Sequence, residues 1–131
     1  MSALWDFLME HPVTGLREEV IVSPRLAEHP FTITAVSAGE MAEYTGRCKT
    51  SPQAGAGFDG EKFNLLLILN HCVEPDFRNS DALAQAGCAT PEELVNKTLK
   101  AGEIAYLARA IYRLSGYDQT MTELRDTVKN S

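Results

Sequence analysis

The chain has 131 residues, enough for one domain with a substantial core, and its content of 44% hydrophobic and 23% charged residues is ordinary for a soluble globular protein. Its formal net charge of −6 argues against a nucleic-acid-binding protein, which needs clustered Lys and Arg, and against binding to an anionic membrane. The three cysteines are an odd number without a CxxC spacing, so we expect reduced thiols rather than a disulfide framework.

The N-terminus lacks the basic segment and the long apolar segment of a secretory signal, so we expect a cytoplasmic protein. Residues 3–10 are predicted to form a short amphipathic helix that ends before Pro12. Its apolar side is formed by Leu4, Trp5, Leu8 and Met9. Two interpretations stay open: the helix docks on the core, or it binds a partner with Trp5 as an exposed anchor.

Two strands are predicted next. Residues 17–23 are rich in β-branched side chains, and residues 31–36 alternate apolar and polar side chains with the two-residue period of a half-buried strand. The connection between them permits an antiparallel hairpin. Since a two-stranded sheet is marginally stable alone, the hairpin must rest on helices or pair its edge with another chain.

A helix that runs to about residue 49 is predicted from Ser37 and Glu40, which have the spacing of a capping box. Residues 50–58 have the composition of a flexible, Gly-rich loop. Residues 55–60 match GxGxxG by letter, but no strand precedes them and they lie in no βαβ unit. We therefore interpret this segment as a linker and not as a nucleotide-binding loop.

The longest run of large apolar residues is 65–69. Because successive residues of a helix turn by about 100°, this run covers every side of a helix, and such a helix is normally buried. Residues 61–73 are therefore predicted to form the central helix, against which the other elements pack.

The rest of the chain is predicted to be helical. Further helices are expected over residues 80–86, 90–99, 103–115 and 119–128. Thr90 is a good N-cap, Gly102 is expected to separate two helices, and Gly116 lies where a helix-ending glycine should, with Tyr117 making the closing apolar contact. The predicted fold is α+β: a mainly helical single domain over residues 1–131 with a small antiparallel β-hairpin near the N-terminus.

No motif of a catalytic, cofactor or metal site is found, and we expect none of these residues. His71 and Cys72 are adjacent, so on a helix they diverge by about 100° and cannot hold one metal ion together. Cys72 is expected in the core, and His71 at a helix end near the negative pole of the helix dipole. A Cys/His pair or a carboxylate such as Asp76, assembled in three dimensions, is the weaker alternative of a small enzyme.

The order of several short segments resembles a known family. These segments are Val20–Ser23, Arg25, Pro30–Val36, Val73–Phe77, Ala86–Gly87, Pro91–Leu94, Gly102–Glu103 and Gly116–Asp118. Over about residues 16–118 the chain resembles the tail assembly chaperones of long-tailed phages, in particular the type found in PBSX-like prophages of Gram-positive bacteria. The Trp5 segment and the Gly-rich loop lie outside this resemblance.

The resemblance implies a non-enzymatic assembly factor. It implies binding to the long, helical tape measure protein, which is kept soluble until tail tube subunits polymerise around it, after which the chaperone leaves and is absent from the mature virion. The tail tube protein and further copies of this chain are other expected partners. We expect Trp5 and Leu8, together with Phe77 and Tyr117, to bind the partner, with ordinary core packing as the alternative for each. A structural tail or adaptor protein that stays in the particle is the alternative function.

Overall fold

The computed structural model describes residues 2–50 and 57–117. The helices there are α1 (Ala3–Glu10), α2 (Ala38–Arg47), α3 (Gly60–His71), α4 (Ser80–Ala86), α5 (Pro91–Thr98) and α6 (Ala101–Leu114). The strands are β1 (Arg17–Val20), β2 (Phe31–Thr34) and β3 (Cys72–Glu74), and short 3-10 turns cover Val13–Gly15 and Pro24–Leu26. The predicted α+β fold, mainly helical with a small antiparallel sheet near the N-terminus, is confirmed.

The sheet has three strands in the order β1-β2-β3, so the prediction of a two-stranded hairpin was incomplete. The predicted pair forms, with Val20 opposite Phe31, but both strands are shorter than expected. The third strand was missed because the central helix was predicted to continue to residue 73. Instead α3 ends at His71, and Cys72 has extended backbone angles that start β3 beside β2.

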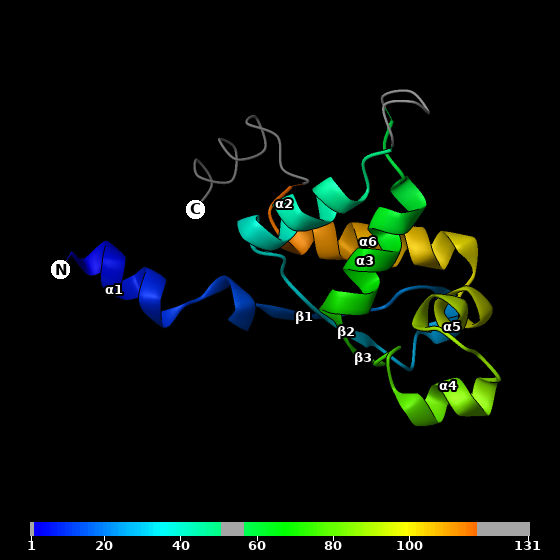
Figure 1. Cartoon of the computed structure of the whole chain (residues 1–131). Helices are drawn as coiled ribbons and strands as arrows, with labels where there is room; N and C mark the ends of the chain where they lie inside the picture. The colour runs from blue at the N-terminus through cyan, green and yellow to red at the C-terminus, as the bar shows by residue number, and fades with distance from the viewer. Residues whose placement is uncertain (1, 51–56, 118–131) are drawn as a thin grey trace.

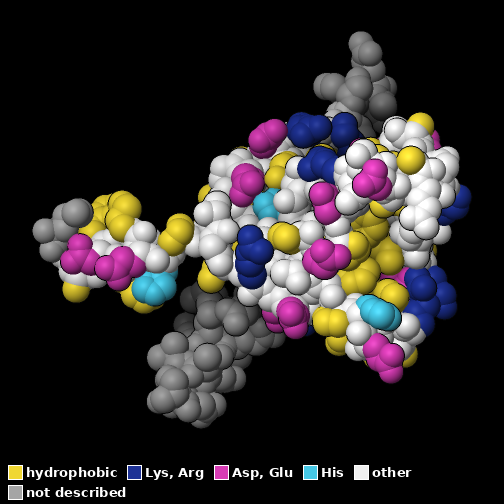
Figure 2. All heavy atoms as spheres, turned by 90° about the horizontal axis from the view of Figure 1, so that it is seen from below, with side chains coloured by type: hydrophobic (Ala, Val, Ile, Leu, Met, Phe, Trp, Pro, Cys, Tyr) yellow, Lys and Arg dark blue, Asp and Glu magenta, His cyan; other side chains and the backbone are white. Residues whose placement is uncertain are grey.

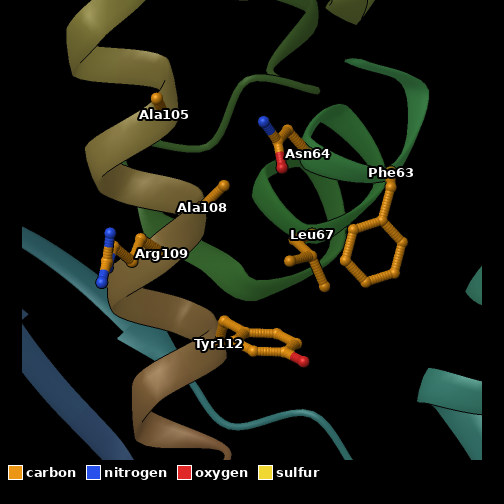
Figure 3. A pocket seen from close by; sticks show the side chains of 7 residues that line it. All are labelled: Phe63, Asn64, Leu67, Ala105, Ala108, Arg109 and Tyr112. Atoms are coloured by element: carbon orange, nitrogen blue, oxygen red, sulfur yellow. The ribbon is translucent and has the colours of Figure 1, made fainter. Parts of the chain in front are cut away.

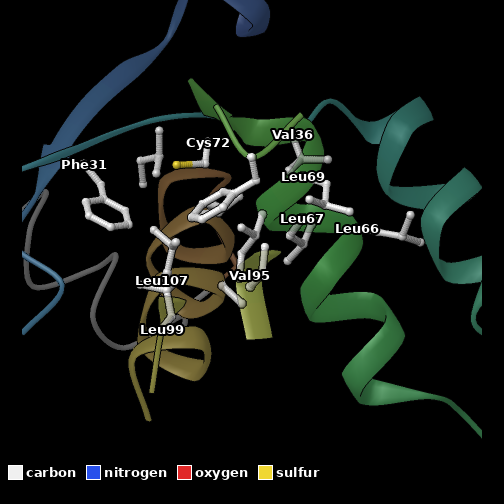
Figure 4. Packing of buried hydrophobic residues seen from close by; sticks show 14 of the residues in the cluster. Phe31, Val36, Leu66, Leu67, Leu69, Cys72, Val95, Leu99 and Leu107 are labelled. Carbon is white, nitrogen blue, oxygen red and sulfur yellow. The ribbon is translucent and has the colours of Figure 1, made fainter. Parts of the chain in front are cut away.

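The core lies where α3 meets the sheet, α5 and α6. Four consecutive side chains of α3, Leu66 to Leu69, are buried and Leu65 is half-buried, so the expected burial holds for most of the apolar run. Figure 4 shows Leu67 and Leu69 on the side of α3 that faces buried side chains from β2, α5 and α6. The alternation predicted for β2 is also confirmed, because Phe31 and Ile33 face the core while Thr32 and Thr34 are half-buried.

Local capping sequences position the helices. Ser37 and Glu40 form the predicted capping box of α2, and the hydroxyl of Thr90 accepts a hydrogen bond from the amide of Glu93 at 3.2 Å. Gly87 and Gly116, with φ of 70° and 95°, take the left-handed conformation at the ends of α4 and α6.

The predicted start of α6 was wrong, whereas the predicted bounds of α4 were correct. Gly102 does not separate helices but lies in the first turn of α6, which the carboxylate of Glu103 caps by accepting a hydrogen bond from the amide of Lys100 at 2.7 Å. The predicted helix over 80–86 matches α4, and the side chain of Asn79 caps it by accepting a hydrogen bond from the amide of Ala82 at 3.0 Å. The predicted helix over 119–128, and most of the predicted loop over 50–58, lie outside the described residues.

The arrangement of the elements leaves the N-terminus separate from the rest. In Figure 1, α1 stands apart at one end of the molecule, whereas α5 and the beginning of α6 lie at the opposite end of the body. The short segment that contains the turn Val13–Gly15 joins α1 to β1. No residue of α1 is buried.

Candidate protein-binding surfaces

The N-terminal arm, residues 2–11, is the most apolar exposed element among the described residues. Its helix is held only by local interactions: the hydroxyl of Ser2 accepts a hydrogen bond from the amide of Trp5 at 3.2 Å, and the ring of His11 stacks on Phe7 with centroids 4.2 Å apart. Trp5, the only tryptophan in the sequence, is 52% exposed and Leu8 is 49% exposed. A partner can therefore reach both residues that the sequence analysis selected.

The apolar face of the arm is wider than predicted. Large exposed side chains are contributed by Leu4, Trp5, Phe7, Leu8 and Met9. At about 100° per residue they cover an arc of roughly 200°, and Asp6 and Glu10 occupy the opposite side. Figure 2 shows these yellow and magenta side chains on the arm, clear of the body. Phe7 was not selected from the sequence, although the same helical geometry places it at the edge of this arc.

The other two predicted binding residues have different surroundings. Phe77 is 5% exposed and belongs to the hydrophobic core, so its ring is not presented to a partner. Tyr117 is 47% exposed and stacks on Tyr112 of α6 with ring centroids 4.5 Å apart. The predicted closing contact of Tyr117 is thus made with Tyr112, and one side of the ring pair is open to solvent.

A shallow hollow lies between α3 and α6. Its volume is about 410 Å³, and Phe63, Leu67, Ala108 and Tyr112 form its apolar part. Figure 3 shows the rings of Phe63 and Tyr112 on either side of Leu67. Asn64 and Arg109 also line the hollow, so it is a mixed polar and apolar surface next to the stacked tyrosine pair.

A larger groove is formed by the segment after β1 and the beginning of α6. We call it the Arg25 groove; its volume is about 850 Å³. Its apolar surface comes from Ile21, Val22, Pro24 and Tyr106, and its charged side chains are Arg25, Lys100 and Glu103. Ile21 and Tyr106 are both more than two-fifths exposed, so the groove opens to solvent.

The carboxylate in this groove is firmly paired. The guanidinium of Arg25 donates to both oxygens of Glu103 at 2.6 and 2.7 Å, and the hydroxyl of Ser23 donates at 2.5 Å. These contacts, the hydrogen bond from Arg25 foremost, lower the pKa of Glu103 to about 2. The buried carboxylate joins the end of β1 to α6, and it is not a free acid or base in a cleft.

The histidine and cysteine of α3 and β3 are also structural in their contacts. His71 is the last residue of α3, as expected, and its side chain is buried, with Nε2 2.9 Å from the hydroxyl of Tyr44 and Nδ1 3.2 Å from that of Thr34. Burial raises the pKa of the Cys72 thiol to about 12, and the thiol donates to the carbonyl of Pro75. A protonated Cys72 whose histidine neighbour is engaged elsewhere lacks the activation that a catalytic thiol needs.

None of the helices in the described part of the chain has the length and hydrophobicity needed to cross a bilayer. Among the same residues, no three His, Cys, Asp or Glu side chains gather as metal ligands would.

Comparison with known proteins gives one family and one fold. The family described as phage XkdN-like tail assembly chaperone protein matches residues 4–129. The crystal structure of the protein YqbN, a structural genomics target, is similar with a TM-score of 0.68 and 19% sequence identity, over 90% of this chain and 99% of that chain. No curated protein sequence matches significantly.

Proposed function

We propose that this chain, which belongs to the phage XkdN-like tail assembly chaperone family, binds the tape measure protein in the host cytoplasm and keeps it soluble until the tail tube polymerises. The family match carries this proposal. It extends over the N-terminal arm, which lay outside the resemblance found from the sequence.

The arm supplies the physical basis for binding such a client. A long helix without partners exposes apolar stripes, and a second helix with a wide apolar face can cover them. The arm offers such a face on both sides of Trp5, and the Tyr112–Tyr117 pair with the neighbouring hollow offers a second, partly apolar surface. None of these surfaces needs bond-making chemistry, which fits a non-enzymatic role.

Co-expression with the tape measure protein of the same phage tests the proposal. We expect the soluble fraction of the tape measure protein to rise when this chain is present. Trp5→Glu should abolish that rise, because it removes the largest apolar side chain of the arm and places a charge within the apolar arc. Ala3→Glu is the matched control, since it adds the same charge on the polar side of α1, and it should act like the wild type. An unchanged insoluble fraction with the wild-type chain would contradict the proposal.

Departure from the finished tail is a separate part of the proposal. The alternative function, a structural tail or adaptor protein, requires the chain to stay in the particle. Mass spectrometry of purified particles distinguishes the two: we expect peptides of the tail tube and tape measure proteins and none of this chain. A fixed, stoichiometric amount of this chain in the particles would favour the structural role.

A further inference from the structure

We propose that, when no client is bound, the N-terminal arm of one subunit docks in the Arg25 groove of a second copy of this chain. The inference concerns self-association and does not depend on the identity of the client. It rests on three features. The arm makes no packing contact that buries its side chains, the groove is complementary to the arm in hydrophobicity and charge, and the two surfaces lie at opposite ends of the molecule.

The arm lacks the support that a short helix needs. An isolated helix of fewer than about 12 residues is marginal in water, and most helices are stabilised by packing of their apolar face. The eight residues of α1 have a side-chain cap at Ser2 but bury nothing. Five exposed large apolar side chains in one short helix also favour association with another surface. The arm therefore has the properties of a segment that becomes stable when it is covered.

The Arg25 groove complements the arm in hydrophobicity and charge. Its apolar surface includes the exposed side chains of Ile21 and Tyr106, which can receive the apolar arc around Trp5. The acidic side chains of the arm, Asp6 and Glu10, have no basic neighbour within α1.

The rim of the groove can supply that basic partner. It carries Arg25 and the exposed Lys100, and the one carboxylate in the groove, Glu103, is already paired with Arg25. An acidic, apolar helix therefore meets an apolar groove with an excess of one positive charge. This pattern gives the docked arm a preferred orientation in addition to apolar burial.

The positions of the two surfaces point to a second copy as the occupant. Figure 1 places α1 at one end of the molecule and the beginning of α6, which lines the groove, at the other. Figure 2 shows exposed hydrophobic side chains next to basic ones at that far end of the body, away from the arm. Because the arm and the groove lie at opposite ends of the molecule, one pair of subunits is poorly placed to make both contacts at once, so docking is head-to-tail and each subunit of a row donates one arm and receives one. Such contacts produce rings or open rows rather than closed two-fold dimers.

Two variants separate this arrangement from its alternatives. Trp5→Glu places a charge on the apolar face of the arm and leaves the groove unchanged. Tyr106→Glu places a charge in the groove and leaves the arm unchanged. We expect the wild type to increase in mass with concentration in light scattering coupled to size-exclusion chromatography, and each variant alone to stay monomeric. An equimolar mixture of the two variants should form a 1:1 dimer and nothing larger, because only one arm and one complementary groove remain.

The single tryptophan reports on the arm directly. In the mixture all tryptophan emission comes from the Tyr106→Glu subunit, since the other subunit has lost Trp5. We expect this emission to shift to shorter wavelength when the Trp5→Glu partner is added, as the indole leaves water. Ala3→Glu, the matched control on the polar side of α1, should keep the wild-type mass and emission.

Three results would overturn the proposal. Self-association of Tyr106→Glu alone would mean that arms pair with each other. A wild type that stays monomeric with blue-shifted Trp5 emission would mean that the arm folds back on its own body. A monomeric wild type with solvent-exposed emission would mean that the arm is uncovered. Circular dichroism establishes that each variant is folded, and Ile21→Glu replaces Tyr106→Glu if the latter is not. Failure of the client solubility experiment would leave these outcomes unaffected.

Discussion

At the scale of single residues, His71 links three elements and makes stability depend on pH near neutrality. Its ring contacts Tyr44 from α2 and Thr34 from β2, and the carboxylate of Glu40 lies 3.8 Å from Nε2. Burial lowers the pKa of His71 below 6.5, and Glu40 only partly opposes this shift. Between the lowered pKa and 6.5, the unfolded chain binds a proton that the folded chain does not, so the free energy of unfolding falls as the pH drops through this range.

Urea denaturation at about pH 7.5 and about pH 5.5 tests this dependence. We expect the wild type to be less stable at the lower pH. His71→Asn should be less stable than the wild type at pH near 7.5 by about 1–3 kcal/mol, because a buried hydroxyl loses its partner, and its loss on acidification should be smaller. His11→Asn, in the exposed arm, should keep the wild-type difference between the two pH values. If the free energy of unfolding changed equally between the two pH values in the wild type, His71→Asn and His11→Asn, this role of His71 would be contradicted.

Glu103 acts in a lower pH range. Its pKa of about 2, below the usual 4.5, means that the ionised carboxylate stabilises the fold above pH 4.5 and that this contribution is lost as the pH falls toward 2. Arg25→Met should lower the urea midpoint at neutral pH and flatten the loss of stability over that acid range, since Arg25 is the main cause of the lowered pKa. Arg17→Met, at the exposed beginning of β1, is the control and should change neither. If Arg25→Met had the same dependence of the urea midpoint on acidic pH as the wild type, the ion pair would not stabilise the fold.

These residue contacts could not have been predicted from the sequence. Arg25 and Glu103 are 78 positions apart, and the partners of His71 come from two other elements. The sequence pattern predicts the helix or strand in or near which each residue lies. It does not predict which polar side chains meet, because that depends on how the elements pack against one another. The burial of Phe77 was not predicted for the same reason. A single aromatic residue in a loop after a helix belongs to no periodic pattern that would indicate whether its side chain is buried or exposed.

At the scale of elements, α3 and α1 are both apolar but contribute differently to stability. Ile68 of α3 is completely buried, whereas Leu8 of α1 is exposed. Ile68→Ala should lower the free energy of unfolding by about 2–5 kcal/mol, because it removes apolar contacts and leaves a cavity. Leu8→Ala removes a similar volume and should change it by less than about 0.5 kcal/mol. Urea denaturation at concentrations where the chain is monomeric measures both effects, and a large effect of Leu8→Ala there would mean that the arm packs on the body.

The elements whose formation is local were predicted well. The caps at Ser37 and Thr90, the alternation over 31–36 and the apolar run of α3 are all encoded within a few residues. The third strand was not predicted, because three residues carry no period and β3 exists through its pairing with β2. The predicted start of α6, residue 103, lies two residues after the observed start at Ala101. A glycine usually interrupts a helix, but here Glu103 caps the first turn and Gly102 lies within it.

At the scale of the whole molecule, the body should fold without the arm. Removal of residues 1–11 deletes every residue of α1 and keeps Leu16, whose carbonyl accepts a hydrogen bond from the amide of Ala35. The shortened chain should have a thermal midpoint within a few degrees of the full chain under conditions where the full chain is monomeric. Differential scanning calorimetry measures this. A drop of more than about 10 °C would show that the arm belongs to the cooperative unit.

An arm that buries nothing within its own subunit also has an evolutionary consequence. Substitutions in the core must preserve packing. Substitutions in residues 2–11 are free of that constraint, and only the binding partner of the arm restricts them. Under the proposed function, specificity for a new client can therefore evolve in this segment without loss of foldability. Exchanging these residues between two such chaperones should transplant client preference from one to the other while leaving each scaffold as it was.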